Sequence, residues 1–140
     1  MNHDIFSQLD YPYEVTTLEA ECDLDNLADC KGFTFQPFYG VKPTRGFMVS
    51  SRKDLEERIP LGEVKPADLY RYMNQHMKLF ESDPRSFFGG WSEDGKFFLD
   101  VSRLVNRKRK ALQLGRKHKQ LAIYDLTAKR SISVETGEYI

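Results

Sequence analysis

The chain has 140 residues and a mass of 16.3 kDa, which is enough for one ordinary domain and too little for two. Its 40% apolar residues, with ten Phe and seven Tyr, argue against wholesale disorder, and 21 basic residues balance 21 acidic ones. No apolar run approaches the roughly 20 residues that span a bilayer, the first residues do not resemble a secretory signal, and two cysteines are too few for a disulfide scaffold. We therefore expect a cytoplasmic globular protein without membrane contact.

The N-terminal part contains few regular elements. Residues 1–12 are predicted to be loosely ordered. The acidic segment 18–30 has spaced leucines and is consistent with either a short helix or an extended loop. Residues 33–39 have the composition of a strand, but Pro37 lacks an amide donor, so this strand lies at a sheet edge or ends early.

The middle of the chain contains the clearest helix. A short strand is predicted at 47–50 and a helical turn at 53–58. The helix is predicted over 66–81, because Pro66 suits a first helical position and apolar side chains recur at helical spacing. These side chains form one stripe: Leu69, Met73, His76, Met77 and Phe80. We expect His76 to be a partly buried imidazole rather than a catalytic base.

Two aromatic runs, at 86–91 and 96–101, flank an Asp-Gly pair and predict a β-hairpin, since glycine supplies the positive φ that such turns require. The two glycines at 89–90 are typical of a bend or a bulge. The aromatic side chains also suggest a platform for stacking nucleic-acid bases, although core packing explains most of them. Adjacent strand residues point to opposite faces, so we expect one of Phe97 and Phe98 to enter the core.

A second principal helix is predicted over 107–118, with Asn106 as its cap, followed by strands at 121–126 and 132–134. With the helix at 66–81, these elements predict an α+β fold, in which the whole chain forms a single domain with a mainly antiparallel sheet.

The second helix has small residues on one face. Ala111 and Gly115 are four apart, which allows the helix to lie close against a sheet. Leu114 lies away from the face that Val105 and Leu112 share, so the pattern does not predict a clean amphipathic helix.

Charge is distributed unevenly along the chain. Residues 1–40 contain eight acidic residues against Lys31 alone, a net of −7, and residues 101–130 contain ten basic residues against Asp125 alone, a net of +9. Three interpretations follow: the two ends neutralise each other within the fold, the basic end binds phosphates, or the acidic end imitates them toward a nucleic-acid-binding protein.

The candidate binding residues lie at these two poles. The basic helix carries seven cations in thirteen residues, whose mutual repulsion a bound anion would relieve. This helix is either a solvated face, a face covered by the acidic N-terminal segment, or a surface for nucleic acid or an acidic partner. The basic candidates are Arg107, Lys108, Arg109, Lys110, Arg116, Lys117 and Lys119. The candidate partner-binding acids are Glu14, Glu19, Glu21, Asp23, Asp25 and Asp29.

Signs of catalysis or cofactor binding are weak. The sequence contains no nucleophile elbow, phosphate loop, dinucleotide fingerprint or zinc-protease motif, so no cofactor and no catalytic residue is predicted. Cys22 and Cys30 lack the short spacing of a zinc knuckle and are expected to be free thiols rather than metal ligands. Asp100 and Asp125 are candidates for a carboxylate pair across neighbouring strands.

Four short blocks stand within residues 86–126: Gly89-Gly-Trp, Gly95-Lys-Phe-Phe-Leu-Asp-Val-Ser-Arg-Leu-Val105, Ala111-x-x-x-Gly115 and Gln120-Leu-Ala-Ile-Tyr-Asp-Leu126. They resemble a largely uncharacterised family of small accessory proteins encoded by phages and prophages. The resemblance implies a mobile-element protein made in a bacterial host, one that engages host or defence machinery. The basic run at 107–110 departs from that family.

These observations favour a non-catalytic protein that occupies a host protein or nucleoprotein complex, for which inhibition of a CRISPR effector is one concrete form. A direct RNA- or DNA-binding protein that uses the basic helix 107–119 is the first alternative. An unfamiliar small enzyme that acts on a nucleotide or a protein is the second. The sequence does not indicate an oligomeric state.

Overall fold

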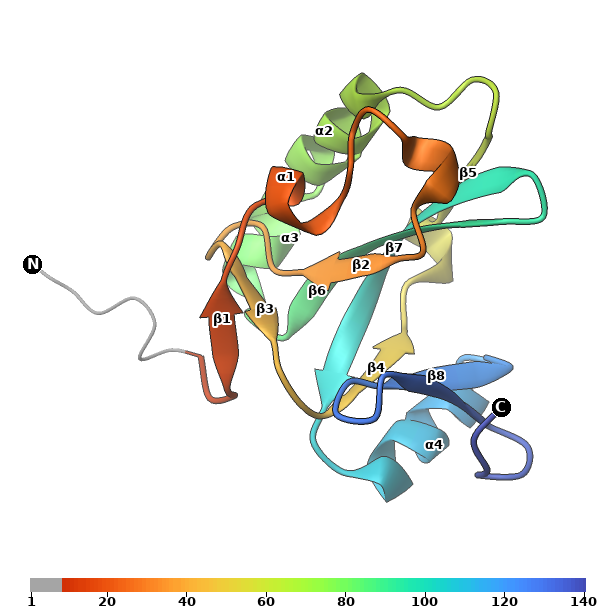
Figure 1. The fold of residues 1–140 in the computed structure, drawn as a ribbon. Coiled ribbons are helices and arrows are strands. Elements are labelled where there is room, and N and C mark those ends of the chain that lie inside the picture. The colour runs from red at the N-terminus through yellow and green to blue at the C-terminus, as the bar shows by residue number, and fades with distance from the viewer. Residues whose placement is uncertain (1–8) are drawn as a thin grey trace, which may run out of the picture.

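The computed structural model describes residues 9–140, which form a seven-stranded antiparallel sheet, a separate two-stranded sheet and helices on the outside (Figure 1). The large sheet has the order β2-β6-β7-β4-β8-β9, and β5 also pairs with β7. Its strands are β2 (Phe33–Phe35), β4 (Phe47–Ser50), β5 (Glu57–Pro60), β6 (Ser86–Glu93), β7 (Lys96–Val105), β8 (Ala122–Asp125) and β9 (Arg130–Ser133).

The small sheet pairs β1 (Tyr13–Val15) with β3 (Val41–Pro43). The helices are α1 (Leu18–Glu21), α2 (Pro66–Gln75), α3 (Met77–Ser82) and α4 (Lys108–Lys117), with 3-10 turns η2 (Leu27–Asp29) and η3 (Lys53–Leu55). This architecture confirms the predicted α+β fold and its mainly antiparallel sheet. Within residues 9–140 no helix combines the length and apolar character that crossing a bilayer requires.

The predicted hairpin forms the centre of the large sheet. β6 and β7 pair from Ser86 opposite Arg103 to Glu93 opposite Lys96. The turn residues Asp94 and Gly95 have φ of 51° and 75°, so both are in the left-handed region that a type I′ turn requires.

The expectation of a bend or bulge at Gly89 and Gly90 is wrong, because the β6–β7 register runs through both without interruption. A Cβ atom at Gly89 would lie 2.6 Å from the Asp100 carboxylate, and one at Gly90 would lie 2.5 Å from the Phe33 ring. Both positions need glycine because neighbouring side chains occupy the space above the strand.

The first core cluster lies between the hairpin and the helices α2 and α3. Tyr72, Phe80, Phe88, Phe97 and Leu99 are all fully buried there. Phe98, by contrast, is only partly buried, which confirms that one of the two adjacent phenylalanines enters the core.

The predicted helix 66–81 is wrong in one respect, because it is divided into α2 and α3 at His76. The His76 backbone leaves the helical region (φ −108°, ψ 13°), and its carbonyl oxygen accepts hydrogen bonds from the Leu79 and Phe80 amides of the new helix. The division preserves the buried stripe, since Leu69 and Phe80, on the two helices, are both fully buried.

A second core cluster contains residues that precede the first strand. Leu9 and Tyr11 are buried with Phe87 and Leu104, and the Tyr11 hydroxyl donates to the Pro84 carbonyl oxygen at 3.0 Å. The expected loose ordering of residues 1–12 is therefore wrong from Leu9 onward, because these side chains pack on the sheet. The remainder of that prediction lies outside the described residues.

The third core cluster lies under α4. Ala111 is fully buried, and Gly115 comes so close to the sheet that a Cβ atom would lie 2.9 Å from Val134 and 3.2 Å from Ile123. This confirms the close approach predicted from the two small residues. Leu112 and Leu114 pack at the margins of the same contact.

The helix α4 is consequently amphipathic, contrary to the sequence interpretation. At about 100° per residue, Ala111 and Gly115 lie at the centre of a broad buried face and the two leucines at its edges. The cap prediction is also wrong: Arg107, not Asn106, is the N-cap, and its side chain makes no capping hydrogen bond.

The other predicted strands and turns are present, whereas β1, β3 and β5 were not predicted. β2 ends at Phe35 and lies at the edge of the sheet, as Pro37 requires. The segment 18–30 forms two short helical turns, and the predicted turn at 53–58 is a 3-10 turn followed by β5.

We expect Gly115→Leu to lower the free energy of unfolding by about 1 to 3 kcal/mol, because the new side chain would displace Val134 and Ile123. Urea denaturation followed by circular dichroism measures the change. Gln113→Leu on the exposed face of α4 is the control and should change stability by no more than about 0.5 kcal/mol. Equal stability of the two variants would contradict the close packing of α4.

Candidate nucleic-acid interface

The basic residues predicted from the sequence lie on and beside α4, some on its outward side and others, such as Arg107 and Lys110, toward the end of β7. All seven are exposed, and none forms an ion pair with any other residue in the described part of the chain. These residues are Arg107, Lys108, Arg109, Lys110, Arg116, Lys117 and Lys119. We refer to this set as the basic face.

The packing of α4 determines which way these cations point. Because Ala111 and Gly115 face the sheet, Arg109, Arg116 and Lys117 project into solvent. The first turn of the helix contains three basic residues and no acidic one. The positive end of the helix dipole therefore coincides with side-chain positive charge, an arrangement that favours an anionic ligand.

The acidic residues gather at the other end of the molecule, around α1 and η2 (Figure 1). Glu21 lies 3.2 Å from the Lys42 amine, Glu14 lies 3.9 Å from the same amine, and Glu19 accepts a hydrogen bond from the Tyr70 hydroxyl. The hypothesis that the acidic segment covers the basic helix is therefore wrong.

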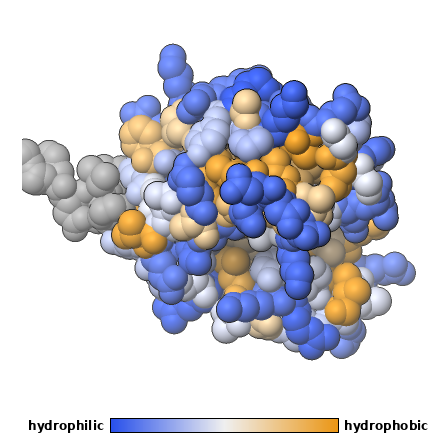
Figure 2. Space-filling model, turned by 45° about the horizontal axis from the view of Figure 1, so that its top comes forward, coloured by the Kyte–Doolittle hydropathy of each residue, from blue (hydrophilic) through white to orange (hydrophobic). Residues whose placement is uncertain are grey.

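The rest of the acidic set remains on the surface. Asp23, Asp25 and Asp29 are exposed. In the described residues they form no ion pair, and Asp29 accepts a hydrogen bond from Asn26 at 2.7 Å. The molecule thus presents opposite charges at opposite ends. Figure 2 shows a surface on which hydrophilic residues predominate and apolar residues form smaller patches between them.

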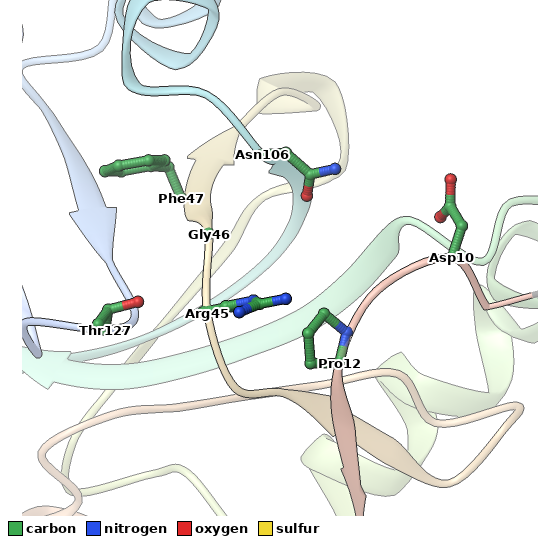
Figure 3. Close-up of a pocket in the computed structure, with 7 residues that line it drawn as sticks. All are labelled: Asp10, Pro12, Arg45, Gly46, Phe47, Asn106 and Thr127. Carbon is green, nitrogen blue, oxygen red and sulfur yellow. The ribbon is translucent and has the colours of Figure 1, made fainter.

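A hollow of about 380 Å³ lies next to the start of α4, where the β3–β4 connection passes the end of β7 (Figure 3). Arg45 extends into it, and Asn106 lines the side nearest to α4. Arg45 was not among the predicted binding residues, because nothing in the local sequence pattern places residue 45 beside residue 106.

Asp100 is buried and does not form a site open to a substrate. It is 1% exposed, and its carboxylate accepts hydrogen bonds from the hydroxyls of Ser50 at 2.8 Å and Ser102 at 3.4 Å. Burial raises the pKa of Asp100 to about 6, with the serine hydrogen bonds acting in the opposite direction.

The predicted carboxylate pair does not form. Asp125 lies opposite Phe47, at the first residue of β4. Asp100 lies at the other end of β4, two residues beyond Ser102, which pairs with the last residue of β4, Ser50. Asp125 instead accepts a hydrogen bond from the Tyr139 hydroxyl at 2.7 Å.

The other residues considered for catalysis or metal binding are one histidine and two cysteines. His76 is half-buried and stacks edge-on against the Tyr72 ring, and burial lowers its pKa. Cys22 and Cys30 are free thiols with their sulfurs 3.7 Å apart. Across residues 9–140 no group of three or more His, Cys, Asp or Glu side chains is placed to hold a metal ion.

The aromatic residues of the hairpin are mostly inside the protein. Phe87, Phe88 and Phe97 are fully buried. Trp91 and Phe98 stack on each other with ring centroids 5.2 Å apart, and Arg58 lies over Phe98. Both rings of this stack are only partly exposed, whereas the cations of the basic face are fully on the surface.

Comparison of the chain with protein-family models, with curated proteins and with solved structures found no match. The class defined by the fold and the site is therefore an α+β protein with a basic helical face.

We expect Asp100→Asn to stabilise the protein at pH 7.5 by about 2 to 3 kcal/mol, because the native pKa of about 6 lies above the ordinary value of 3.8. Protonation of Asp100 then favours the folded state, so its contribution to stability falls as the pH rises from about 4 to about 6. Urea unfolding of both proteins at pH 4, 5.5 and 7.5 tests this. The difference should shrink toward pH 4, and a pH-independent difference would contradict the assignment.

Proposed function

We propose that this protein is a non-catalytic nucleic-acid-binding protein that docks on the phosphate backbone through the basic face of α4. The single observation that carries the proposal is that seven exposed cations lie on and beside one helix without an ion-pair partner in the described residues. Like charges at helical spacing repel by a few tenths of a kcal/mol per pair, and phosphates would turn that repulsion into attraction.

The mode of binding follows from the residue types. Lysine and arginine on a solvent-facing helix contact phosphates, which position a protein on nucleic acid but carry no sequence information. No reader motif accompanies them in the sequence. Binding should therefore depend strongly on salt and weakly on sequence.

The burial of Asp100 supports a non-catalytic function, because a carboxyl group that is 1% exposed cannot touch a substrate. The half-buried imidazole of His76 packs on Tyr72 rather than beside a second catalytic group.

A second candidate function, occupation of a nucleoprotein complex, is favoured by the separate acidic pole. Such a complex offers phosphates to the basic face and a basic protein surface to Asp23, Asp25 and Asp29. The resemblance of residues 86–126 implies a mobile-element protein that engages host or defence machinery, and an inhibitor of a CRISPR effector would be one concrete form of such a protein. Gel filtration with a purified guide-RNA–nuclease complex tests it: replacing the three aspartates by Asn should weaken that complex and not binding to free RNA.

The quadruple variant R107A/K108A/R109A/K110A should bind a 20-base-pair DNA and a 20-nucleotide RNA at least tenfold more weakly at 100 mM salt. It should also reduce the slope of log K against log salt on duplex DNA by about 3 to 4, because each lost phosphate contact removes about 0.9. Fluorescence anisotropy at several salt concentrations measures both quantities.

The matched control for this experiment is K31A/K53A/K78A/K96A, which removes the same charge from exposed lysines elsewhere. It should retain most of the affinity and the slope. An equal loss in both variants, or no binding by the unmodified protein, would refute the proposal.

A further inference from the structure

A second hollow, of about 420 Å³, lies where the end of β7 meets the start of α4. Four of its seven lining residues are cations and none is acidic. The cations are Arg85, Arg103, Arg107 and Lys110, and the other lining residues are Leu104, Val105 and Asn106.

Three separate segments bring these cations together. Arg85 precedes β6, Arg103 lies in β7, and Arg107 and Lys110 belong to the start of α4. The β6–β7 register sets Ser86 opposite Arg103, which puts Arg85 and Arg103 at the same end of the hairpin.

Arg85 and Arg103 are held in place by carboxylates that do not line the hollow. Arg85 pairs with Asp10 at 2.8 Å and donates to the Leu104 carbonyl oxygen at 3.3 Å. Arg103 pairs with Asp83 at 2.6 Å. Ordering these side chains in advance reduces the entropy lost when a ligand binds.

Positive charge remains in excess at this hollow. Two carboxylates accompany four cations, and the side chains of Arg107 and Lys110 have no ion-pair partner among residues 9–140. Planar guanidinium groups match the oxygens of a phosphate in two parallel hydrogen bonds, and a lysine adds a point charge.

We infer that this hollow is a subsite for one phosphate group. The volume is within the usual range for ligand sites and leaves room for the sugar to which a phosphate is attached. In a nucleic-acid strand lying along α4 this phosphate is either internal or terminal. The assignment of this phosphate to a nucleic-acid strand rests on the proposed function, whereas the anion site itself does not.

The central test is Arg103→Gln, measured by fluorescence anisotropy with a 12-nucleotide single-stranded DNA. Arg71→Gln is the matched control, because Arg71 pairs with Glu57 at 2.7 Å and its side chain is 46% exposed, against 44% for Arg103. Arg103→Gln should weaken binding three- to tenfold, and Arg71→Gln should leave it unchanged. Equal effects of the two variants would overturn the subsite.

Asp10→Asn should change the affinity for the oligonucleotide in the opposite direction to Arg103→Gln. Asp10 is largely exposed and neutralises Arg85, so its replacement should tighten binding two- to threefold. A merely structural role of the Asp10–Arg85 pair would weaken binding or leave it unchanged, and either result counts against the subsite.

Oligonucleotides with a 5′-phosphate or a 5′-hydroxyl identify the source of the group. If Arg103→Gln weakens only the phosphorylated strand, the subsite holds a terminal phosphate; if it weakens both, the phosphate is internal.

Failure of the subsite and failure of the proposed function have different signatures. If the quadruple α4 variant loses affinity but Arg103→Gln does not, the subsite is wrong and the proposed function stands. If no oligonucleotide binds, titration of inorganic phosphate against the amide NMR signals of Asn106 and Lys110, at constant ionic strength, decides the anion site alone. Saturable shifts in the unmodified protein that Arg103→Gln abolishes support it, and their absence overturns it.

Discussion

Eight consecutive residue pairs join β6 to β7, and most of the molecule is built outward from this ladder. The edge of β7 that faces away from β6 pairs with both β4 and β5. Two residues of β7, Phe97 and Leu99, pack in the core beneath α2 and α3. A third, Leu104, packs in the cluster that contains Tyr11. The same strand ends directly before α4, so the position of the basic helix depends on the register of the hairpin. The ladder also leaves room above Gly89 for the buried carboxylate of Asp100.

The contact between α4 and the sheet links the fold to the proposed binding surface. Ala111 and Gly115 allow the helix to approach the sheet closely, and this approach orients the cations away from the core. The helix thereby carries positive side chains that form no ion pair among residues 9–140 at the end where its dipole is also positive. The acidic residues around α1 do not relieve it, because their ion pairs are with Lys42 instead. The charge separation present in the sequence is therefore also a separation in space.

Local patterns in the sequence predicted the hairpin, the close approach of the second helix and the edge position of β2 well, since each depends on neighbouring residues. The predictions that failed depended on distant ones. The amphipathic character of α4 was missed because only the larger apolar residues Val105, Leu112 and Leu114 were compared, whereas the small residues Ala111 and Gly115 form the centre of its buried face. The glycines at 89 and 90 suggested a bulge, but the side chains that require them, Asp100 and Phe33, are on other strands.

The sequence by itself determined the α+β character, the hairpin turn at Asp94–Gly95 and the presence of strongly basic and acidic segments, because propensity, periodicity and charge are properties of neighbouring residues. Only the tertiary structure decided that the two charged segments lie apart, and that Asp100 is enclosed. It also brought Arg85 and Arg103 to the start of α4. The physical reason is that strand register and helix packing, which act between residues distant in sequence, set these distances and these degrees of burial.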